Sequence, residues 1–464
     1  MKKIAIIDVG TGETVRSTMG YDGFILYAAM KDDPSREVTF FDDCTPYQIF
    51  LAPRFDVYIV HVWNYHQLPI LNWIRTQMPG EKFFIGYSGF KELTSVPFYP
   101  GWTDETIIEG IKKLPELYNG PSDLKYSGLR CDCDHHISTD DTRPVFPLFL
   151  SYGCPCQCSF CPVPVCRAGS KDARLALNVD EAMAVVEAVV ETEKNIHFFD
   201  EDFFIDRAFT KEIIPRFIQL QRRRVSEGKQ PFKWIALTTV PTLANAIRDF
   251  GQDALIEAGL FLAEMGLESN DPDIRKLMKK TGSADQIGFI IENGDKINKL
   301  WLALTFFPGE TITTLNNMGE FLMVYGLDPD QTGDRLLTNG NICGLGQFFQ
   351  WYHGTSSYDI TRKEGLLLEA NQPLRLVPSY IPQSFLDCKP QLVVHPADKW
   401  VSKFSTAVSI YNLDKYDFGN LQLDGTLTID EIRKTCDIDT GDLMIYLALL
   451  ARFGYIIDAN KEKN

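Results

Sequence analysis

Three cysteines on one short loop set the tightest limit on the fold and chemistry of this chain. Residues 153–166 read GCPCQCSFCPVPVC, in which Cys154, Cys158 and Cys161 form a C-x3-C-x2-C pattern. Three such thiolates can hold three irons of a 4Fe–4S cube and leave the fourth iron open, since thiolates are the usual ligands of these clusters. The preceding apolar segment, residues 145–152, predicts a buried strand. A loop at the end of a strand is where a barrel of parallel strands builds its active site.

A structural zinc site is the alternative for this loop. Such sites usually take four ligands in C-x2-C pairs, and Cys156 or Cys166 could supply the fourth. The 464-residue chain has eleven cysteines, an odd number, and its first residues show no secretory signal. This usage fits reduced thiols and a metal site in the cytoplasm rather than disulfides.

Charge and hydropathy narrow the range of partners. The net charge of −16 disfavours broad attraction to nucleic acid or to an anionic membrane. No apolar stretch approaches the length of a membrane span. The basic run at residues 222–224 fits a solvated helix face. We therefore expect a small-molecule or peptide substrate, no membrane association and no nucleic-acid partner.

Short apolar runs alternate with helical patterns in residues 1–125, which predicts a doubly wound, Rossmann-like parallel sheet. The expected strands are residues 3–9, 37–41, 55–62 and 82–87, and the expected helices are residues 23–30, 64–77 and 103–117. Such a sheet binds ligands at the carboxyl ends of its strands, here residues 10–13, 63–66 and 87–90. No complete G-x-G-x-x-G motif is present, so a scaffold sheet without a ligand stays an alternative.

The cysteine loop resembles the C-x3-C-x-aromatic-C motif of the radical S-adenosylmethionine (SAM) superfamily, with Phe160 as the aromatic residue. The resemblance implies that the open iron chelates the amino and carboxylate groups of SAM. It also implies reductive cleavage of SAM to a 5′-deoxyadenosyl radical, with electrons from an external donor such as flavodoxin or ferredoxin.

Later segments resemble the cobalamin-type and methylthio-type members of that superfamily, in the same order. Residues 200–203 (DEDF) resemble a D-D-x-F strand end, residues 266–269 (GLES) resemble G-x-E-S, and residues 308–311 (PGET) resemble the end of G-x-P-G-E-T. Residues 275–280 (RKLMKK) resemble an L-x-x-M-x-(K/R) helix whose cation pairs with the SAM carboxylate; Arg275, Lys279 and Lys280 are its candidates. The cofactor-binding residues implied are Phe160, Asp200, Asp202, Glu268, Ser269 and Lys279. The plainer interpretation of the acidic and basic segments is charge at helix ends.

With the further strands expected at residues 195–199, 232–238, 260–267, 299–307 and 344–351, residues 144–352 predict a partial (β/α)6 radical SAM barrel. The preceding α/β domain resembles the cobalamin-binding domain of cobalamin-dependent radical SAM enzymes. The D-x-H-x-x-G motif is absent, which leaves no identifiable axial ligand. His61 and His66 lie near a strand end, where a lone histidine is more often a hydrogen-bonded structural residue.

Two regions complete the expected organisation. Residues 126–143 form a polar linker that contains Cys131 and Cys133, and residues 353–464 form a C-terminal capping region. Its end, residues 423–458, predicts a small helical, winged-helix-like module, but its acidic composition disfavours DNA binding. The roles of Cys343 and Cys388 stay open, with a buried structural thiol favoured for each.

The sequence thus predicts a radical SAM enzyme with a 4Fe–4S cluster and SAM, and with cobalamin as a further expected cofactor. The reaction expected is cobalamin-dependent methyl transfer to an unactivated carbon. A radical SAM enzyme without cobalamin, acting by rearrangement, cyclisation, sulfur insertion or atypical SAM cleavage, is one alternative. A zinc-stabilised, non-enzymatic interaction protein is the other. The substrate and the oligomeric state are not determined by the sequence.

Overall fold

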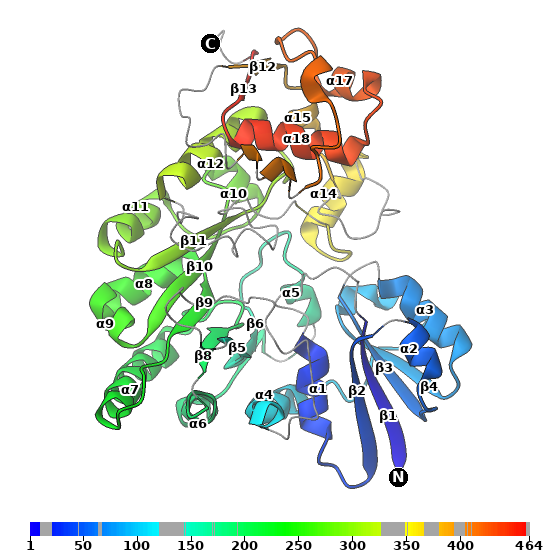
Figure 1. Cartoon of the computed structure of the whole chain (residues 1–464), viewed down its shortest axis with the longest axis vertical. Coiled ribbons are helices and arrows are strands. Elements are labelled where there is room, and N and C mark those ends of the chain that lie inside the picture. The colour runs from blue at the N-terminus through cyan, green and yellow to red at the C-terminus, as the bar shows by residue number, and fades with distance from the viewer. Residues whose placement is uncertain are drawn as a thin grey trace. The chain divides into compact units, whose positions relative to one another are not determined.

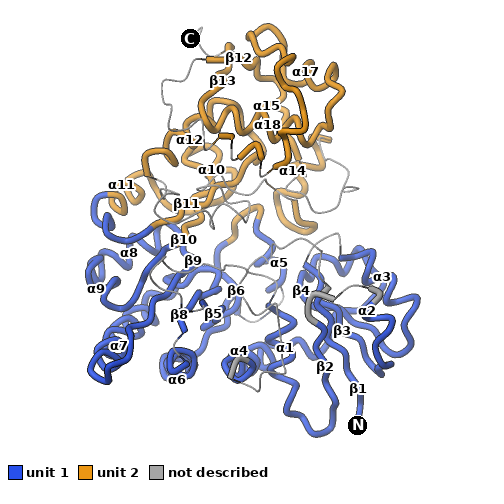
Figure 2. The backbone as a smooth tube through the Cα atoms, in the orientation of Figure 1, with its two compact units in different colours: residues 1–156, 161–263, 292–298 blue, residues 157–160, 264–291, 299–464 orange. Residues whose placement is uncertain are grey.

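The computed structural model describes residues 1–9, 21–63, 67–119, 143–325, 349–365, 380–393 and 404–460, apart from residues 45, 144, 169, 171, 193, 350, 406 and 410. The chain divides into two compact units (Figure 2). Unit 1 comprises residues 1–156, 161–263 and 292–298, and unit 2 comprises residues 157–160, 264–291 and 299–464. The domain boundaries expected from the sequence stay predictions.

Unit 1 begins with a four-stranded parallel sheet of order β2-β1-β3-β4. Its strands are β1 (Lys2–Val9), β2 (Arg36–Cys44), β3 (Val57–Val62) and β4 (Glu81–Gly86), which confirms all four expected strands. The apolar run of β1 lies in the middle of the sheet, where Ile6 faces Phe40 on one side and Ile59 on the other. These side chains are buried because helices cover both faces of a doubly wound sheet.

Helices α1 (Asp22–Met30) and α4 (Asp104–Asn119) lie along one face of this sheet, and α3 (Leu68–Gln77) lies along the other (Figure 1). A short helix, α2 (Pro46–Leu51), and a 3-10 helix, η3 (Ser88–Glu92), were not expected from the sequence. The Thr103 hydroxyl accepts a bond from the N–H of Thr106 (3.3 Å), so Thr103 caps α4 as expected.

A second sheet has the order β11-β10-β9-β8-β5. Its strands are β5 (Val145–Leu148), β8 (Asn195–Phe198), β9 (Trp234–Thr238), β10 (Leu260–Glu268) and β11 (Asn298–Ala303). The intervening helices are α6 (Val179–Val190), α7 (Arg207–Ser226), α8 (Val240–Phe250), α9 (Gln252–Glu257), α10 (Pro272–Leu277) and α11 (Ala284–Asn293). This alternation confirms the expected α/β barrel-type architecture.

Two expected barrel strands differ in the structure. The strand expected over residues 145–152 is broken into β5 and β6 (Ser151–Gly153), and β6 pairs antiparallel with β7 (Arg174–Ala176). The break arises because the Asp200 carboxylate accepts the N–H of Leu150 (3.1 Å), which removes that peptide from the sheet ladder. The strand expected over residues 344–351 falls mostly outside the described residues. Within it, Phe349 donates its N–H to the carbonyl of Thr305 (2.7 Å) without forming a strand.

Unit 2 ends in a helical module with its own apolar core. Its remaining elements are α12 (Ile312–Tyr325), α14 (Ser356–Glu364), α15 (Gln383–Leu386), β12 (Pro390–Leu392), η5 (Phe418–Asn420), α17 (Ile429–Thr435), α18 (Thr440–Arg452) and β13 (Ile456–Asp458). Strands β12 and β13 pair antiparallel where the sequence predicted a wing. Thr428 caps α17 through its hydroxyl, and Asp439 caps α18, which begins at Thr440.

This C-terminal module forms hydrogen bonds with α12 and with the chain just beyond β11. Asn316 of α12 donates its side-chain amide to the carbonyls of Ala451 and Ile456. Arg452 of α18 is buried and donates to the carbonyl of Leu304, just beyond β11 (3.1 Å). Among the described helices, none combines the length and apolar composition that crossing a membrane requires.

Candidate functional site

The cysteine loop begins where β6 ends and leads into the short helix α5 (Val163–Cys166). Gly153 has a φ of 92°, and a Cβ there would lie 2.5 Å from the carbonyl oxygen of Ala173, so the turn into the loop requires glycine. The three expected ligands, Cys154, Cys158 and Cys161, are half-buried and form no disulfide.

Ser159 anchors the middle of this loop. Its N–H donates to the carbonyl of Met278 (2.8 Å), and its hydroxyl donates to the carbonyl of Leu277 (3.1 Å) at the end of α10. Its own carbonyl accepts from the N–H (2.9 Å) and the hydroxyl of Ser357 in α14. The segment between Cys158 and Cys161 is therefore held by two helices of unit 2.

Phe160, the aromatic residue of the motif, packs edge-on against Phe307 with ring centroids 6.3 Å apart. The ammonium group of Lys280 lies 5.8 Å from the centroid of the Phe160 ring, within the range of a cation–π contact. Phe160 thereby connects the cysteine loop to an apolar cluster that includes Met278 and Phe349.

Glu268 ends β10 and forms an ion pair with Lys280, with 3.1 Å between carboxylate oxygen and ammonium nitrogen. The Glu268 and Lys280 side chains are only 13% and 8% exposed, respectively. A Cβ on Gly266 would lie 2.6 Å from this carboxylate and 2.8 Å from the ammonium group, so the pair occupies the space that glycine leaves. The positive φ of Glu268 (66°) turns its side chain at the end of the strand.

The structure separates the three cations suggested by the sequence. Lys279 is exposed, whereas Lys280 pairs with Glu268 and lies beside Phe160. Arg275 is buried and donates to the carbonyl of Thr281 (2.6 Å). The geometry therefore favours Lys280 over Lys279 as the cation at this site. Ser269 is buried, and its hydroxyl accepts the N–H of Asp271 (3.2 Å).

Asp200 and Asp202 are both buried at the end of β8 and both carry structural hydrogen bonds. Asp200 accepts from the hydroxyl of Ser151, and burial raises the pKa of Asp200 above its ordinary value. Asp202 accepts from the hydroxyls of Thr239 (2.8 Å) and Thr242 (2.9 Å) at the start of α8. Their expected contact with a cofactor stays a prediction.

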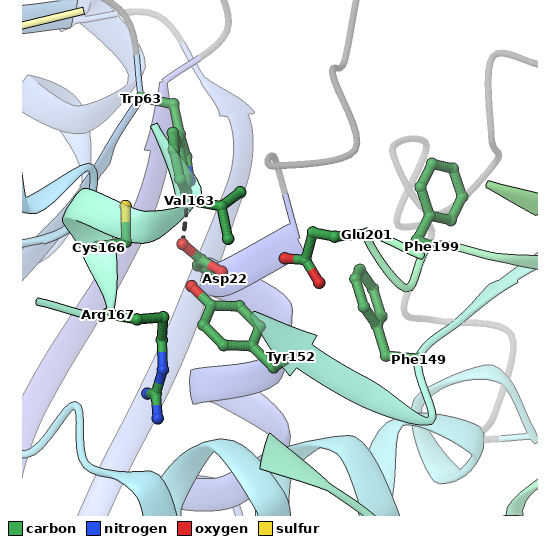
Figure 3. Close-up of a pocket in the computed structure, with 9 residues that line it drawn as sticks. All are labelled: Asp22, Trp63, Phe149, Tyr152, Val163, Cys166, Arg167, Phe199 and Glu201. Carbon is green, nitrogen blue, oxygen red and sulfur yellow. Dashed lines mark hydrogen bonds between the residues drawn. The ribbon is translucent and has the colours of Figure 1, made fainter. Parts of the chain in front are cut away.

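The residue between them, Glu201, enters a small cavity within unit 1 instead. Figure 3 shows Asp22 and Glu201 directing their carboxyl groups toward each other beside the Tyr152 hydroxyl. The cavity has a volume of about 20 Å³, room for roughly one water. Its lining consists of Asp22, Trp63, Phe149, Tyr152, Val163, Cys166, Arg167, Phe199 and Glu201.

Both carboxyl groups of this cavity bind protons more strongly than usual. Burial raises the pKa of Asp22 to about 6, against the opposing charge of His61 and the hydrogen bond from the Trp63 indole (2.9 Å). Burial also raises the pKa of Glu201 to about 8, although Glu201 accepts the N–H of Gly153 (3.0 Å). Both carboxyl groups of the cavity therefore keep a proton to a higher pH than an exposed carboxyl group does.

His61 lies at the carboxyl edge of the N-terminal sheet and is almost wholly buried. Its Nδ1 lies 3.2 Å from Asp8, and its Nε2 lies 3.8 Å from Asp22. These contacts confirm the expected structural role of His61. His66 and the loop at residues 10–13 lie outside the described residues, as do Cys131, Cys133 and Cys343.

The P-G-E-T turn follows β11 and has a buried acid at its centre. The Glu310 carboxylate accepts the N–H of Phe306 (2.6 Å). Burial raises the pKa of Glu310 to about 7, and the charge of Arg452 opposes that rise. Burial in turn lowers the pKa of Arg452 to about 10, against the attraction of Glu310. These contacts hold the turn through Glu310.

Three further cysteines that the sequence singled out are described, namely Cys156, Cys166 and Cys388. Cys166 ends α5 and lines the cavity of unit 1, where burial raises the pKa of its thiol. Cys156 lies within the cysteine loop and is half-buried. Cys388 is buried in the C-terminal module and donates to the carbonyl of Ser384 (3.3 Å), as a structural thiol does.

Comparison with known proteins identifies a domain that contains many of these residues. Residues 148–322 match the family model described as the radical SAM superfamily. This match contains the cysteine loop, Glu268 and the P-G-E-T turn. The chain contains a radical SAM domain. No match to the curated proteins was found.

Two solved structures share the fold of nearly the whole chain. The radical SAM methyltransferase TsrM from Kitasatospora setae, with tryptophan and a SAM analogue bound, gives a TM-score of 0.54 at 14% identity, over 98% of this chain and 96% of that chain. The cobalamin-dependent radical SAM enzyme OxsB with aqua-cobalamin gives 0.54 at 14% identity, over 99% and 82%. At such low identity these likenesses concern the fold alone.

The donor set of the radical SAM domain suits a 4Fe–4S cluster, because each of three thiolates can bind a different iron of a cube. Residues 145–168, with the five cysteines of residues 154–166, are all described. Neither there nor elsewhere in the described parts of the chain do three or more His, Cys, Asp or Glu side chains group around a single ion.

Sequence reasoning missed three residues of the site and left a fourth, Lys280, as one of three candidate cations. No sequence signal separated Lys280 from Lys279, because its position depends on how the chain leaves α10. Glu201 was passed over because the motif resemblance falls on its neighbours. Asp22 and Ser357 had no sequence signal, because their roles depend on contacts far along the chain.

Proposed function

We propose that this chain is a radical SAM enzyme whose cluster is held by Cys154, Cys158 and Cys161, and that it methylates an unactivated carbon with the help of cobalamin. The observation that carries the proposal is the cysteine loop, anchored through Ser159 beside the Glu268–Lys280 pair within a radical SAM domain. The likeness of the whole chain to TsrM and OxsB supports the cobalamin part.

A bound 4Fe–4S cluster would supply an electron and an iron with an open position for SAM. The chain's own part is to bind and orient SAM beside it. Glu268 offers carboxylate oxygens to the ribose hydroxyls or the ammonium group of SAM, since bonds to a carboxylate are the stronger kind. Lys280 would hold Glu268 in place and can pair with the SAM carboxylate, and Phe160 shields this side from water.

The N-terminal sheet would hold cobalamin at its carboxyl edge, the position where doubly wound sheets bind ligands. Cobalamin would supply a cobalt centre able to carry a methyl group. His61 does not fit as a cobalt ligand, because its ring is buried between Asp8 and Asp22. Among the described residues we therefore assign no axial ligand, and Asp22 and Glu201 instead offer a proton-holding site within the same unit.

A radical SAM enzyme without cobalamin is the second candidate. It is favoured by the closed packing of Asp8, Asp22 and His61 at the sheet edge, together with the absence of D-x-H-x-x-G. For either candidate we propose a small-molecule or peptide substrate, flavodoxin or ferredoxin as electron donor, and a cytoplasmic location. The acidic net charge of −16 supports a substrate other than nucleic acid.

Anaerobic reconstitution with iron, sulfide and hydroxocobalamin tests these statements. After unbound material is removed, we expect about four irons per chain and stoichiometric cobalt, and slow SAM cleavage under reduction. The Cys158→Ala variant should lose the cluster, whereas Cys388→Ala, which removes a thiol of the C-terminal core, should keep it. Iron without cobalt would leave the radical SAM enzyme and exclude the cobalamin mechanism. Zinc without iron in anaerobically isolated protein would exclude both.

A further inference from the structure

One residue of the cysteine loop is held by hydrogen bonds at its N–H, its side chain and its carbonyl. Ser159 lies between Cys158 and Cys161 in sequence and is 2% exposed. Its N–H and its hydroxyl are bound by carbonyls of α10, at 2.8 Å and 3.1 Å. Its carbonyl faces the first turn of α14, more than 190 residues further along the chain. A loop held at its N–H, side chain and carbonyl has little freedom left at this residue.

The hydrogen bonds to the Ser159 carbonyl come from Ser357. Its N–H donates to the Ser159 carbonyl at 2.9 Å, and its hydroxyl donates to the same oxygen. Ser357 is wholly buried, so water cannot replace either bond. The hydroxyl of Ser356 reaches this oxygen only at 3.4 Å, a weaker contact.

The start of α14 is built so that these donors remain available. Thr355 stands at the cap position, but its hydroxyl donates to the carbonyl of Tyr352 (2.7 Å), and its side chain accepts no bond from the helix. The first N–H groups of a helix need an acceptor from elsewhere. The Ser159 carbonyl meets that need, so the helix end and the loop satisfy each other.

We propose that Ser357 is a positioning residue for the iron–sulfur cluster: through the Ser159 carbonyl, α14 fixes the segment that carries Cys158 and Cys161. This inference rests on the proposed function, because it concerns a cluster held by these cysteines. It makes α14, in the C-terminal part of the chain, a component of the cluster site.

The test uses reconstituted full-length protein. In Ser357→Ala the hydroxyl bond is lost and the N–H bond remains. We expect a chelator such as bathophenanthroline to remove iron about three- to tenfold faster, the effect of one buried hydrogen bond. The electron paramagnetic resonance spectrum of the reduced cluster with SAM should also change. The matched control is Thr361→Val, which removes a buried hydroxyl that donates within α14, to the carbonyl of Tyr358 (2.9 Å).

A second variant and a measurement on the wild type keep the test decisive. Ser159→Ala removes the bond to Leu277, and combined with Ser357→Ala it should accelerate iron loss by more than the product of the single effects, because both bonds hold one residue. In wild-type apo-protein, the amides of Ser159 and Ser357 should be protected from hydrogen exchange. Unprotected amides, or a folded Ser357→Ala variant with wild-type iron release and spectrum, would overturn the inference. Wild type that binds no iron would instead refute the proposed function.

Discussion

The two units place buried carboxyl groups in different surroundings. In unit 1, Asp22 and Glu201 share one small cavity, and burial outweighs the attraction of nearby groups, so that their pKa values rise to about 6 and 8. In unit 2, Glu268 is paired with Lys280 at 3.1 Å. Glu310 lies near the cation Arg452, although burial still raises the pKa of Glu310 to about 7. An ion pair needs a fixed distance between its two charges. A protonated carboxylic acid carries no charge and needs no such distance.

This difference matches what each region has to do. Around the cysteine loop, an ion pair and several short hydrogen bonds define positions, which a bound cofactor requires. The cavity of unit 1 stores a proton in an enclosed space beside Tyr152 and Cys166. Such a perturbed pair is typical of functional sites, although structural networks also produce it.

The largest effect is expected where the buried cation of unit 2 is removed. In Arg452→Met, Glu310 loses the charge that opposes its burial. Above pH 8 the free energy of unfolding should fall by about 3–5 kcal/mol. Because the pKa of Glu310 is about 7 already in the wild type, the loss should shrink at pH 6, where Glu310 is protonated.

Denaturant unfolding of apo-protein at pH 6 and pH 8.5 measures this difference. Adding Glu310→Gln should restore much of the stability at the higher pH, since no buried charge then remains. The matched control is Arg222→Met, which breaks an exposed pair with Glu257 (2.6 Å) and should cost less than about 1 kcal/mol. Equal losses for both arginines would contradict the role assigned to burial.

The next prediction concerns unit 1, where the substitution should raise the stability of the fold instead of lowering it. The pKa of Glu201 is about 8 in the folded chain and near 4.5 in the unfolded chain. Its contribution to stability is therefore complete below pH 4.5 and is lost as the pH rises through 8. Glu201→Gln keeps an acceptor for the Gly153 N–H but does not ionise. It should therefore be more stable than wild type at pH 9 by a few kcal/mol, because a difference of one between the folded and unfolded pKa values corresponds to about 1.4 kcal/mol.

Thermal unfolding of apo-protein between pH 5 and pH 9 tests this expectation. Wild type should lose stability steadily over this range, and the variant should follow a flatter curve. Glu187→Gln, on the exposed face of α6, is the control and should not alter the slope. A wild-type curve that is flat from pH 5 to pH 9 would show that Glu201 is not protonated in the folded chain.

The sequence predicted the periodic parts of this molecule well and the contacts between distant segments poorly. All four strands of the N-terminal sheet follow from short apolar runs between turns, as in Lys2–Val9. The break between β5 and β6 does not, because it depends on Asp200, some fifty residues further along the chain. The motif resemblance likewise identified Glu268 but left its partner Lys280 as one of three candidate cations, because the position of Lys280 depends on how the chain leaves α10.

A smaller effect is expected when the ion pair of unit 2 loses its charge but not its shape. Glu268→Gln keeps the hydrogen-bonding side chain and removes the attraction to Lys280. SAM affinity of the reconstituted enzyme, measured by calorimetry, should fall by about ten- to a hundredfold, the range of a charge-assisted hydrogen bond. Lys279→Ala, which alters an exposed side chain, should change it by less than about twofold. If Lys279→Ala weakened SAM binding more than Glu268→Gln did, Lys279 rather than Lys280 would be the cation of this site.

The smallest effect tests whether the position of the pair matters as well as its charge. In Gly266→Ala the new Cβ would lie 2.6 Å from the Glu268 carboxylate and 2.8 Å from the Lys280 ammonium group. Both are ends of flexible side chains, so they can move aside, and unfolding should change by less than about 1 kcal/mol. The displaced pair should nevertheless bind SAM about three- to tenfold more weakly, since precise placement of ligand contacts carries affinity.

Gly288→Ala provides the matched control for this substitution. Gly288 lies in α11, and nothing lies within 4 Å of the Cβ that alanine would add. Alanine should therefore stabilise that helix by up to about 1 kcal/mol and leave SAM binding unchanged. If Gly266→Ala also left SAM binding unchanged while Glu268→Gln weakened it, charge alone would matter at this site. The Glu268–Lys280 pair would then not need a fixed position, and the contrast between the fixed pair of unit 2 and the protonated acids of unit 1 would not hold.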